Sequence, residues 1–137
     1  MLHENIKDYQ EVKEKVWGKE FWIVNNQDYC GKVLVLKVRQ RCSIHYHQIK
    51  KETFFLISGK IILEVGIKRI IMTPGTSITI VPNMRHRFTG IDETSEIVEF
   101  SSQHFEDDSY REAESGEVPD KEWEDIKKEL FQRREEV

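Results

Sequence analysis

The sequence contains few of the features that mark specialised classes of protein. Of its 137 residues only Cys30 and Cys42 are cysteines, so we expect two free thiols and a cytoplasmic location rather than a disulfide framework. No stretch approaches the roughly 20 apolar residues of a membrane span, and no secretory leader opens the chain. The basic residues lack interleaved aromatics, which argues against a nucleic-acid partner. The content of 38% hydrophobic and 34% charged residues fits one globular domain.

The net charge of −4 is unevenly distributed along the chain. Nine lysines or arginines but only two acids, Glu52 and Glu64, lie between Cys30 and Ile71, whereas the chain from Glu106 onward is strongly acidic. Two solvated faces would produce this distribution. A basic sheet that attracts an anionic small molecule, such as a sugar phosphate, would also produce it.

Short β-prone runs separated by turn signals dominate the first hundred residues. Their spacing predicts an all-β sandwich or barrel, without the helices that alternate with strands in a parallel sheet. Before them, the apolar residues from Ile6 to Val16 follow a loose helical period, which predicts a helix or an irregular segment. The predicted strands are 20–25, 32–39, 43–48, 52–58, 60–65, 69–72, 77–81, 85–89 and 96–101.

The composition changes after Ser102. Residues 103–118 are acidic and predicted to form a loop, and Pro119 suits the first turn of a helix. In the following segment one amphipathic face contains Trp123, Ile126 and Leu130, with Phe131 at its edge. We therefore expect a single domain in which 1–102 form a β-barrel with an N-terminal extension, and 103–137 form the acidic loop and a helix packed on the barrel or on a partner.

The strongest chemical signal lies in the stretch SIHYHQIKKETFFLISG, from Ser43 to Gly59. His45 and His47 are two residues apart, so on a strand both imidazoles face the same side. Glu52 opens the next apolar run and can direct its carboxylate to the same point. Together with His86 downstream, these side chains predict a site for one divalent transition metal, with a position open for water or substrate. Zn, Mn, Fe, Ni and Co all fit such a site.

The spacing of these residues resembles the first motif of the cupin superfamily, which is HxH, four residues, Glu, six residues and Gly. Gly75 and His86, separated by ten residues that include Pro82, resemble the second motif. One departure is Arg39, which stands where the family has glycine. The resemblance implies a small antiparallel β-barrel of the double-stranded β-helix or jelly-roll type, a homodimer, and a metal inside the barrel held by His45, His47, Glu52 and His86.

Further features resemble the cupin domain of type II mannose-6-phosphate isomerases. They are Trp17-Gly18, Arg41-Cys42-Ser43, Pro82 to Arg87, and the acidic stretch Glu106 to Asp108 followed by Arg111. This resemblance implies action on a sugar or sugar phosphate, by aldose–ketose isomerisation in polysaccharide or nucleotide-sugar metabolism.

Such an isomerase moves a proton between C1 and C2 of the sugar and stabilises negative charge on the adjacent oxygens, for which a metal and a nearby base are suited. Phe54 shares strand parity with Glu52, and Phe88 with His86, so both rings can line the cavity. Ordinary core packing is the simpler alternative for each ring. By resemblance, the candidate residues are Glu99 or His104 as the base, Arg41, Arg87 or Arg111 as phosphate ligands, and Phe54 and Phe88 as cavity walls.

Two functions from other classes remain open at this point. The same four ligands could hold Fe(II) in a dioxygenase, which iron content and oxygen uptake would reveal. Alternatively, the chain could be a sugar-binding or regulatory cupin without catalysis. Tight sugar binding without hydrogen exchange at C2 would favour that function.

Overall fold

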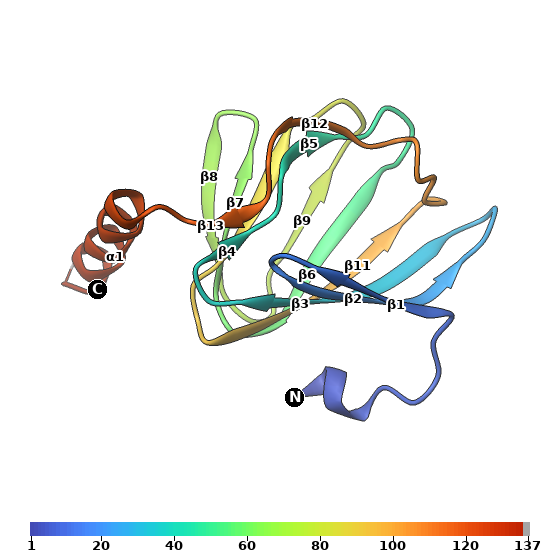
Figure 1. Cartoon of the computed structure of the whole chain (residues 1–137), viewed down its shortest axis with the longest axis horizontal. Helices are drawn as coiled ribbons and strands as arrows, with labels where there is room; N and C mark the ends of the chain where they lie inside the picture. Colours follow the sequence, from blue (N-terminus) through green and yellow to red (C-terminus); the bar gives the residue numbers. More distant parts are fainter. Residues whose placement is uncertain (136–137) are drawn as a thin grey trace.

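The computed structural model describes the backbone of residues 1–135 and the side chains as far as Gln132. Two antiparallel sheets face each other and close around a core (Figure 1). The first, sheet A, has the order β1 (Glu11–Lys15), β2 (Gly18–Asn25), β3 (Cys30–Lys37), β11 (Thr94–Ser101), β6 (Glu52–Ser58) and β9 (Ser77–Ile80).

Sheet B has the order β12 (Tyr110–Ala113), β5 (Ile44–Tyr46), β10 (His86–Gly90), β4 (Gln40–Arg41) and β13 (Gly116–Glu117). Strand β7 (Ile61–Val65) pairs with β10 and with β8 (Lys68–Met72). All of these strands pair in the antiparallel sense. The all-β prediction with a C-terminal helix, α1 (Asp120–Glu135), is therefore confirmed.

The strand period decides which side chains enter the core. On β6, Phe54 and Leu56 are buried, whereas Phe55 between them is only partly buried and Ile57 is exposed. The same alternation on the other strands builds one cluster between the sheets, which removes its apolar surface from water. Its buried members are Trp17, Leu34, Leu36, Cys42, Phe54, Leu56, Ile61, Leu63, Met72, Ile80, Phe88 and Ile97. Both cysteines are buried free thiols.

Among the residues with positive φ, Gly59 and Arg39 adopt that conformation for different reasons. Gly59, the glycine of the first motif, has φ +84°, and a Cβ there would lie 2.3 Å from Ser95 Oγ. Arg39 has φ 65° despite its side chain. Its Nε donates to the carbonyl of Val118 at 2.8 Å, and its guanidinium pairs with Asp120. The arginine that replaces the family glycine therefore ties this turn to the start of α1.

The N-terminal segment differs from its prediction. Leu2–Asn5 forms a 3₁₀ helix, and Glu11–Lys15 forms strand β1 instead of continuing a helical stripe. Ile6 and Val12 pack against Phe21 on the outer face of sheet A. All five residues of β1 pair with residues of β2. This pairing outweighs the loose helical spacing of the apolar residues, so the segment forms a strand.

The acidic segment is also more ordered than predicted, because β12 and β13 lie within it and pair with β5 and β4. Helix α1 has the predicted amphipathic face, and it packs beside β7 and β8 (Figure 1). Its Trp123, Ile126 and Leu130 join a cluster with Ile62 and Val118. Residues 136–137 of the predicted C-terminal part lie outside the described residues, and the division at residue 102 stays a prediction.

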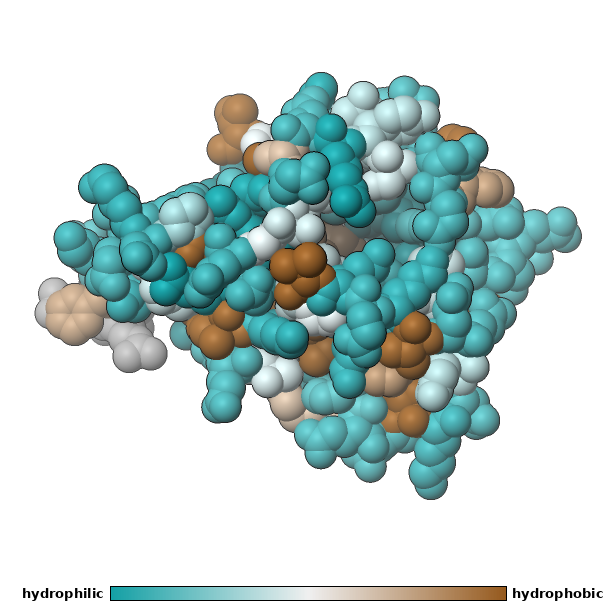
Figure 2. All heavy atoms as spheres, in the orientation of Figure 1, coloured by the Kyte–Doolittle hydropathy of each residue, from teal (hydrophilic) through white to brown (hydrophobic). Residues whose placement is uncertain are grey.

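The surface shown in Figure 2 is mainly hydrophilic, with apolar side chains in small separate groups. No helix among the described residues is long and apolar enough to cross a membrane. On the outer face of sheet A, Ile57 and Phe100 are 36% and 57% exposed. A second copy could cover them, but the homodimer and the cytoplasmic location both stay predictions.

Candidate metal centre

Strand pairing brings the three motif histidines together. His45 lies on β5 and faces His86 on β10 in the sheet register, with ring centroids 4.3 Å apart. His47 follows β5, and its ring lies 5.1 Å from that of His45. Residues 41 positions apart in sequence thus become neighbours because β10 runs antiparallel to β5.

Each of these imidazoles donates a hydrogen bond through Nδ1 to a backbone carbonyl. The acceptors are Ser43 for His45 at 2.9 Å, Asp108 for His47 at 2.7 Å and Met84 for His86 at 2.9 Å. Because a carbonyl only accepts, Nδ1 carries the proton and a neutral ring has its lone pair on Nε2. One ligand atom from each of the three histidines lies within 4.8 Å of the others.

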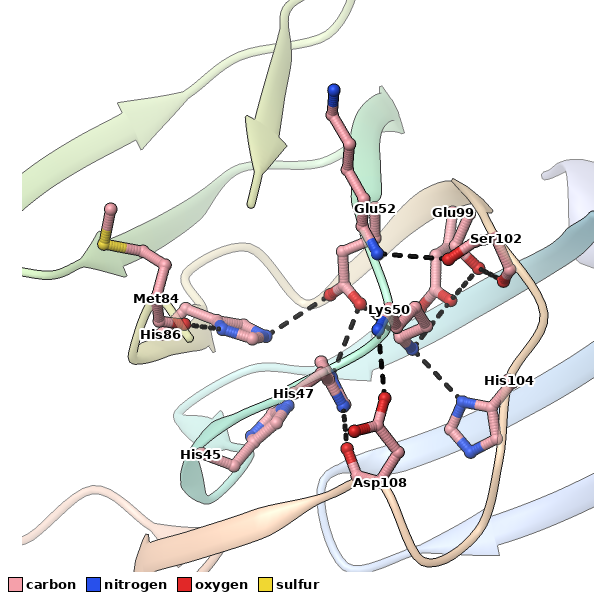
Figure 3. A network of polar contacts seen from close by, with 12 residues as sticks. His45, His47, Lys50, Glu52, Met84, His86, Glu99, Ser102, His104 and Asp108 are labelled. Atoms are coloured by element: carbon pink, nitrogen blue, oxygen red, sulfur yellow. Dashed lines mark hydrogen bonds and ion pairs between the residues drawn. The ribbon is translucent and has the colours of Figure 1, made fainter. Parts of the chain in front are cut away.

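Glu52 adds a carboxylate to this cluster from the start of β6. Its Oε2 lies 3.4 Å from His47 Nε2, and its Oε1 lies 3.3 Å from His86 Nε2 (Figure 3). Both Glu52 Oε2 and His86 Nε2 are buried, and among the described residues neither forms a hydrogen bond, although Lys50 Nζ lies 3.0 Å from Oε2 as an ion-pair partner. Buried polar atoms are normally paired, and lone pairs that face each other repel. A cation between them resolves this conflict, so the donor set fits a metal.

The electrostatics of the cluster also fit a cation. Burial, followed by the nearby His86, lowers the pKa of His45 to about 3. Burial and then the Lys50 ammonium lower the pKa of His47. For Glu52, burial alone would raise the pKa, but Lys50 and His86 outweigh it and lower the pKa below its ordinary value. Neutral imidazoles beside an ionised carboxylate are suitable ligands for a divalent transition metal.

The profile described as "Cupin domain" matches residues 32–100, which include the histidines, Glu52 and most of both sheets. The chain is a cupin. The first motif and the second motif identified from spacing alone both fall within the matched region.

Known proteins similar to this cupin include a sugar isomerase. D-lyxose ketol-isomerase from Thermofilum sp. (strain ex4484_79) is 34% identical, over 61% of this chain and 62% of its own length. Among solved structures, KdgF from Halomonas sp. matches 78% of this chain and 94% of its own, with a TM-score of 0.63 and 14% identity. The capsular polysaccharide assembling protein CapF from Staphylococcus aureus matches 74% of this chain and 33% of its own, with a TM-score of 0.67 and 16% identity. These two structures support the fold alone.

A cavity of about 320 Å³ opens beside the metal ligands, and His45, His47 and Glu52 line it. We call these three residues, together with the buried His86 that contacts them, the floor. One side of the cavity, which we call the charged wall, consists of the buried charges of Lys32, Lys50 and Glu99 together with the partly buried His104. Lys50 Nζ lies 3.0 Å from Glu52 Oε2 and 3.1 Å from Glu99 Oε2. Lys32 Nζ lies 4.0 Å from Glu99 Oε2 and 3.8 Å from the centroid of the Trp22 ring.

His104 occupies the junction of the two lysines. Its Nδ1 lies 3.1 Å from Lys32 Nζ and 3.2 Å from Lys50 Nζ, so this nitrogen accepts from ammonium groups. Burial, followed by the positive charges of Lys32 and Lys50, lowers the pKa of His104 to about 2. The ring is therefore neutral, and its proton is on Nε2.

Five of the seven residues predicted for catalysis or substrate binding line the cavity, namely Glu99, His104, Phe54, Phe88 and Arg111. Arg41 and Arg87 do not. Arg41 donates to Glu122 of α1 at 2.8 Å, and Arg87 donates to the carbonyls of Cys42 at 2.9 Å and Glu114 at 3.0 Å. These contacts give both arginines partners within the fold, and their role as phosphate ligands stays a prediction.

Sequence reasoning missed several residues of the site. Lys50 shares strand parity with Glu52, and Lys32 shares it with the buried Leu34, so parity could have indicated both. Trp22 gave no such signal, because the register of β2 shifts between Trp22 and Val24.

Proposed function

We propose that this cupin is a metal-dependent aldose–ketose isomerase that acts on a monosaccharide. The observation that carries the proposal is the convergence of three Nε2 lone pairs and one carboxylate at the floor of a small cavity that contains further acid–base groups. A divalent transition metal held by His45, His47, Glu52 and His86 would supply the positive charge that favours negative charge on the C1 and C2 oxygens of the sugar. The D-lyxose ketol-isomerase relative supports this class of reaction.

The charged wall provides groups for the proton transfer. In the proposal, the Glu99 carboxylate takes the proton from C2 and returns it to C1. Burial alone would lower the pKa of Lys50, but Glu99 and Glu52 outweigh burial and raise it, so Lys50 stays an ammonium that can donate to a sugar oxygen. Since Nδ1 of His104 already faces two lysines, His104 acts as a donor through Nε2 and not as the base.

The charge balance of the cavity favours an unphosphorylated sugar. Lys32 and Lys50 each lie within 4.0 Å of a carboxylate, so their positive charges are compensated inside the protein. Arg111 is exposed at the cavity, and among the described residues it forms no ion pair. A sugar phosphate, such as the mannose 6-phosphate implied by the sequence resemblance, would therefore depend on Arg111 and on Lys15, which also lines the cavity and forms no ion pair among the described residues. The cavity volume lies at the low end of the range for small-molecule sites, which suits one sugar ring.

Exchange of hydrogen at C2 tests the proposal directly. The protein, loaded separately with Mn²⁺, Co²⁺ or Zn²⁺, is incubated in deuterated water with D-lyxose, D-mannose and mannose 6-phosphate, and deuterium at C2 is followed by NMR. We expect exchange with at least one sugar, its loss with a chelator, and its loss in Glu99→Gln with metal binding retained. Sugar binding without exchange would identify a binding protein instead, and iron with oxygen uptake would identify a dioxygenase.

A further inference from the structure

Asp108 makes a set of contacts that the proposed reaction does not use. It lies in the loop between β11 and β12 and is only 3% exposed. Its Oδ1 accepts the backbone N–H of Gln48 at 2.9 Å and of Ile49 at 3.1 Å. Its Oδ2 accepts the N–H of Ile49 at 3.2 Å and of Lys50 at 3.0 Å. Three consecutive peptide groups of one turn therefore converge on a single carboxylate.

This turn connects the two halves of the metal centre. The turn consists of residues 48–50. His47 directly precedes it, Lys50 is its last residue, and Glu52 lies two residues further on. No cationic side chain among the described residues pairs with the Asp108 carboxylate, so its negative charge is stabilised by oriented peptide dipoles, as in an anion-binding nest. Hydrogen bonds to an ionised acceptor are stronger than those between neutral groups. The carboxylate consequently fixes the backbone that separates His47 from Glu52.

The backbone of the same residue fixes His47 itself. The carbonyl of Asp108 accepts from His47 Nδ1 at 2.7 Å, which leaves the Nε2 lone pair directed toward Glu52 (Figure 3). The other two histidines differ in this respect. Their acceptors, Ser43 and Met84, lie only two residues before His45 and His86, whereas Asp108 lies 61 residues after His47. Of the three rings, His47 alone depends on a distant loop.

We propose that Asp108 is the positioning residue of the metal centre. Its carboxylate anchors the loop to the turn 48–50, and that anchor places its carbonyl where it selects the Nδ1–H tautomer of His47. Loss of the carboxylate releases the loop, so both His47 and the turn lose their orientation. The inference rests on the metal-binding part of the proposed function, but it does not depend on which reaction the centre performs.

The test compares Asp108→Ala and Asp108→Asn with the exposed neighbour Asp107→Ala as the matched control. Two quantities are measured, namely the dissociation constant for Co²⁺ alone and the imidazole ¹⁵N chemical shifts of the metal-free proteins. Removal of an outer partner of a metal-ligating histidine typically weakens metal binding by about 10–100-fold. We expect a loss in that range for Asp108→Ala, a smaller loss for Asp108→Asn, which retains one acceptor oxygen, and none for Asp107→Ala.

The ¹⁵N shifts separate positioning from general loosening of the fold. We expect His47 alone to change toward a mixture of tautomers, whereas His45 and His86 keep their signals because their acceptors are local. Wild-type Co²⁺ affinity in Asp108→Ala, or equal changes in all three rings, would overturn the proposal. If Asp108→Ala does not fold, Asp108→Asn gives the same two readings, and wild-type values there would overturn it equally. A wild-type protein that binds Co²⁺ but isomerises no sugar would refute the proposed function and leave this inference standing.

Discussion

The floor and the charged wall of the cavity are built on opposite electrostatic principles. At the floor, three lone-pair nitrogens face a carboxylate, and among the described residues Glu52 Oε2 and His86 Nε2 lack hydrogen bonds. In the wall, the lysine ammonium groups lie against Glu99 and His104, so the opposite charges meet inside the protein. The floor therefore leaves the lone pairs of its histidines for a cation from outside, even though Lys50 lies beside Glu52, whereas the charges of the wall are paired within the protein. Substitutions at the floor should change metal binding, and those in the wall should change folding and turnover.

The largest expected effect comes from the floor. His86→Ala and Glu52→Gln each remove one ligand, so they should weaken metal binding by more than the roughly 10–100-fold lost with an outer partner. The metal content of protein purified without added metal measures this effect. Glu52→Gln also removes a charged partner of Lys50, and His86→Ala leaves a cavity at a buried side chain, so both metal-free variants should be less stable than the metal-free wild type. Full metal loading in both variants would show that the ligand assignment is wrong.

The next effect distinguishes the wall from the floor. Lys50→Met removes the ammonium that lies within 3.1 Å of both Glu52 and Glu99, leaving two buried carboxylates without this partner. Removal of one member of a buried pair typically costs about 3–5 kcal/mol. We expect a loss of that order in the free energy of unfolding, measured with urea in the absence of metal. Lys51→Met, at the exposed neighbour, is the matched control and should change little.

Added metal sharpens this second prediction. A cation at the floor compensates the negative charge of Glu52 but not that of Glu99. Added Zn²⁺ should therefore restore part, but not all, of the stability lost in Lys50→Met. Equal stability of the variant and the wild type without metal would mean that the two carboxylates do not depend on Lys50.

The floor was predictable from sequence, whereas of the wall only Glu99 and His104 were predicted and the two lysines were not, for a physical reason. The spacing of His45, His47 and Glu52 is local, so strand and turn geometry alone bring these groups together. The wall joins β3, the turn before β6, β11 and the loop that follows β11. Its assembly depends on a strand register that cannot be read from a single sequence. Glu99 opposes Lys32 on β3 because β11 pairs antiparallel with it. The N-terminal segment was misjudged for the same reason, since its pairing with β2 outweighs its local periodicity.

A moderate effect concerns the pH dependence of the wall. His104 has a pKa of about 2 in the folded protein, against roughly 6.5 in an unfolded chain. Below that higher pKa the unfolded state binds a proton that the folded state does not, so stability falls as pH decreases toward the folded pKa. His104→Gln removes this difference. Its free energy of unfolding without metal should therefore decline less steeply between about pH 7 and pH 4, and an unchanged slope would show that His104 is not held neutral.

The smallest expected effect tests whether Arg41 belongs to the substrate site. Arg41 resembles a substrate ligand in sequence, but it donates to Glu122, whose side chain is 46% exposed. Exposed ion pairs contribute at most about 1 kcal/mol, so Arg41→Gln should lower the free energy of unfolding by no more than that. It should leave the affinity for every sugar unchanged. Arg111→Gln is the informative counterpart, because Arg111 lines the cavity. This substitution should weaken the binding of phosphorylated sugars only. If Arg41→Gln weakened the binding of a sugar phosphate and Arg111→Gln did not, the substrate would have to enter on the side of α1, and the cavity beside the histidines would not be the site of its phosphate.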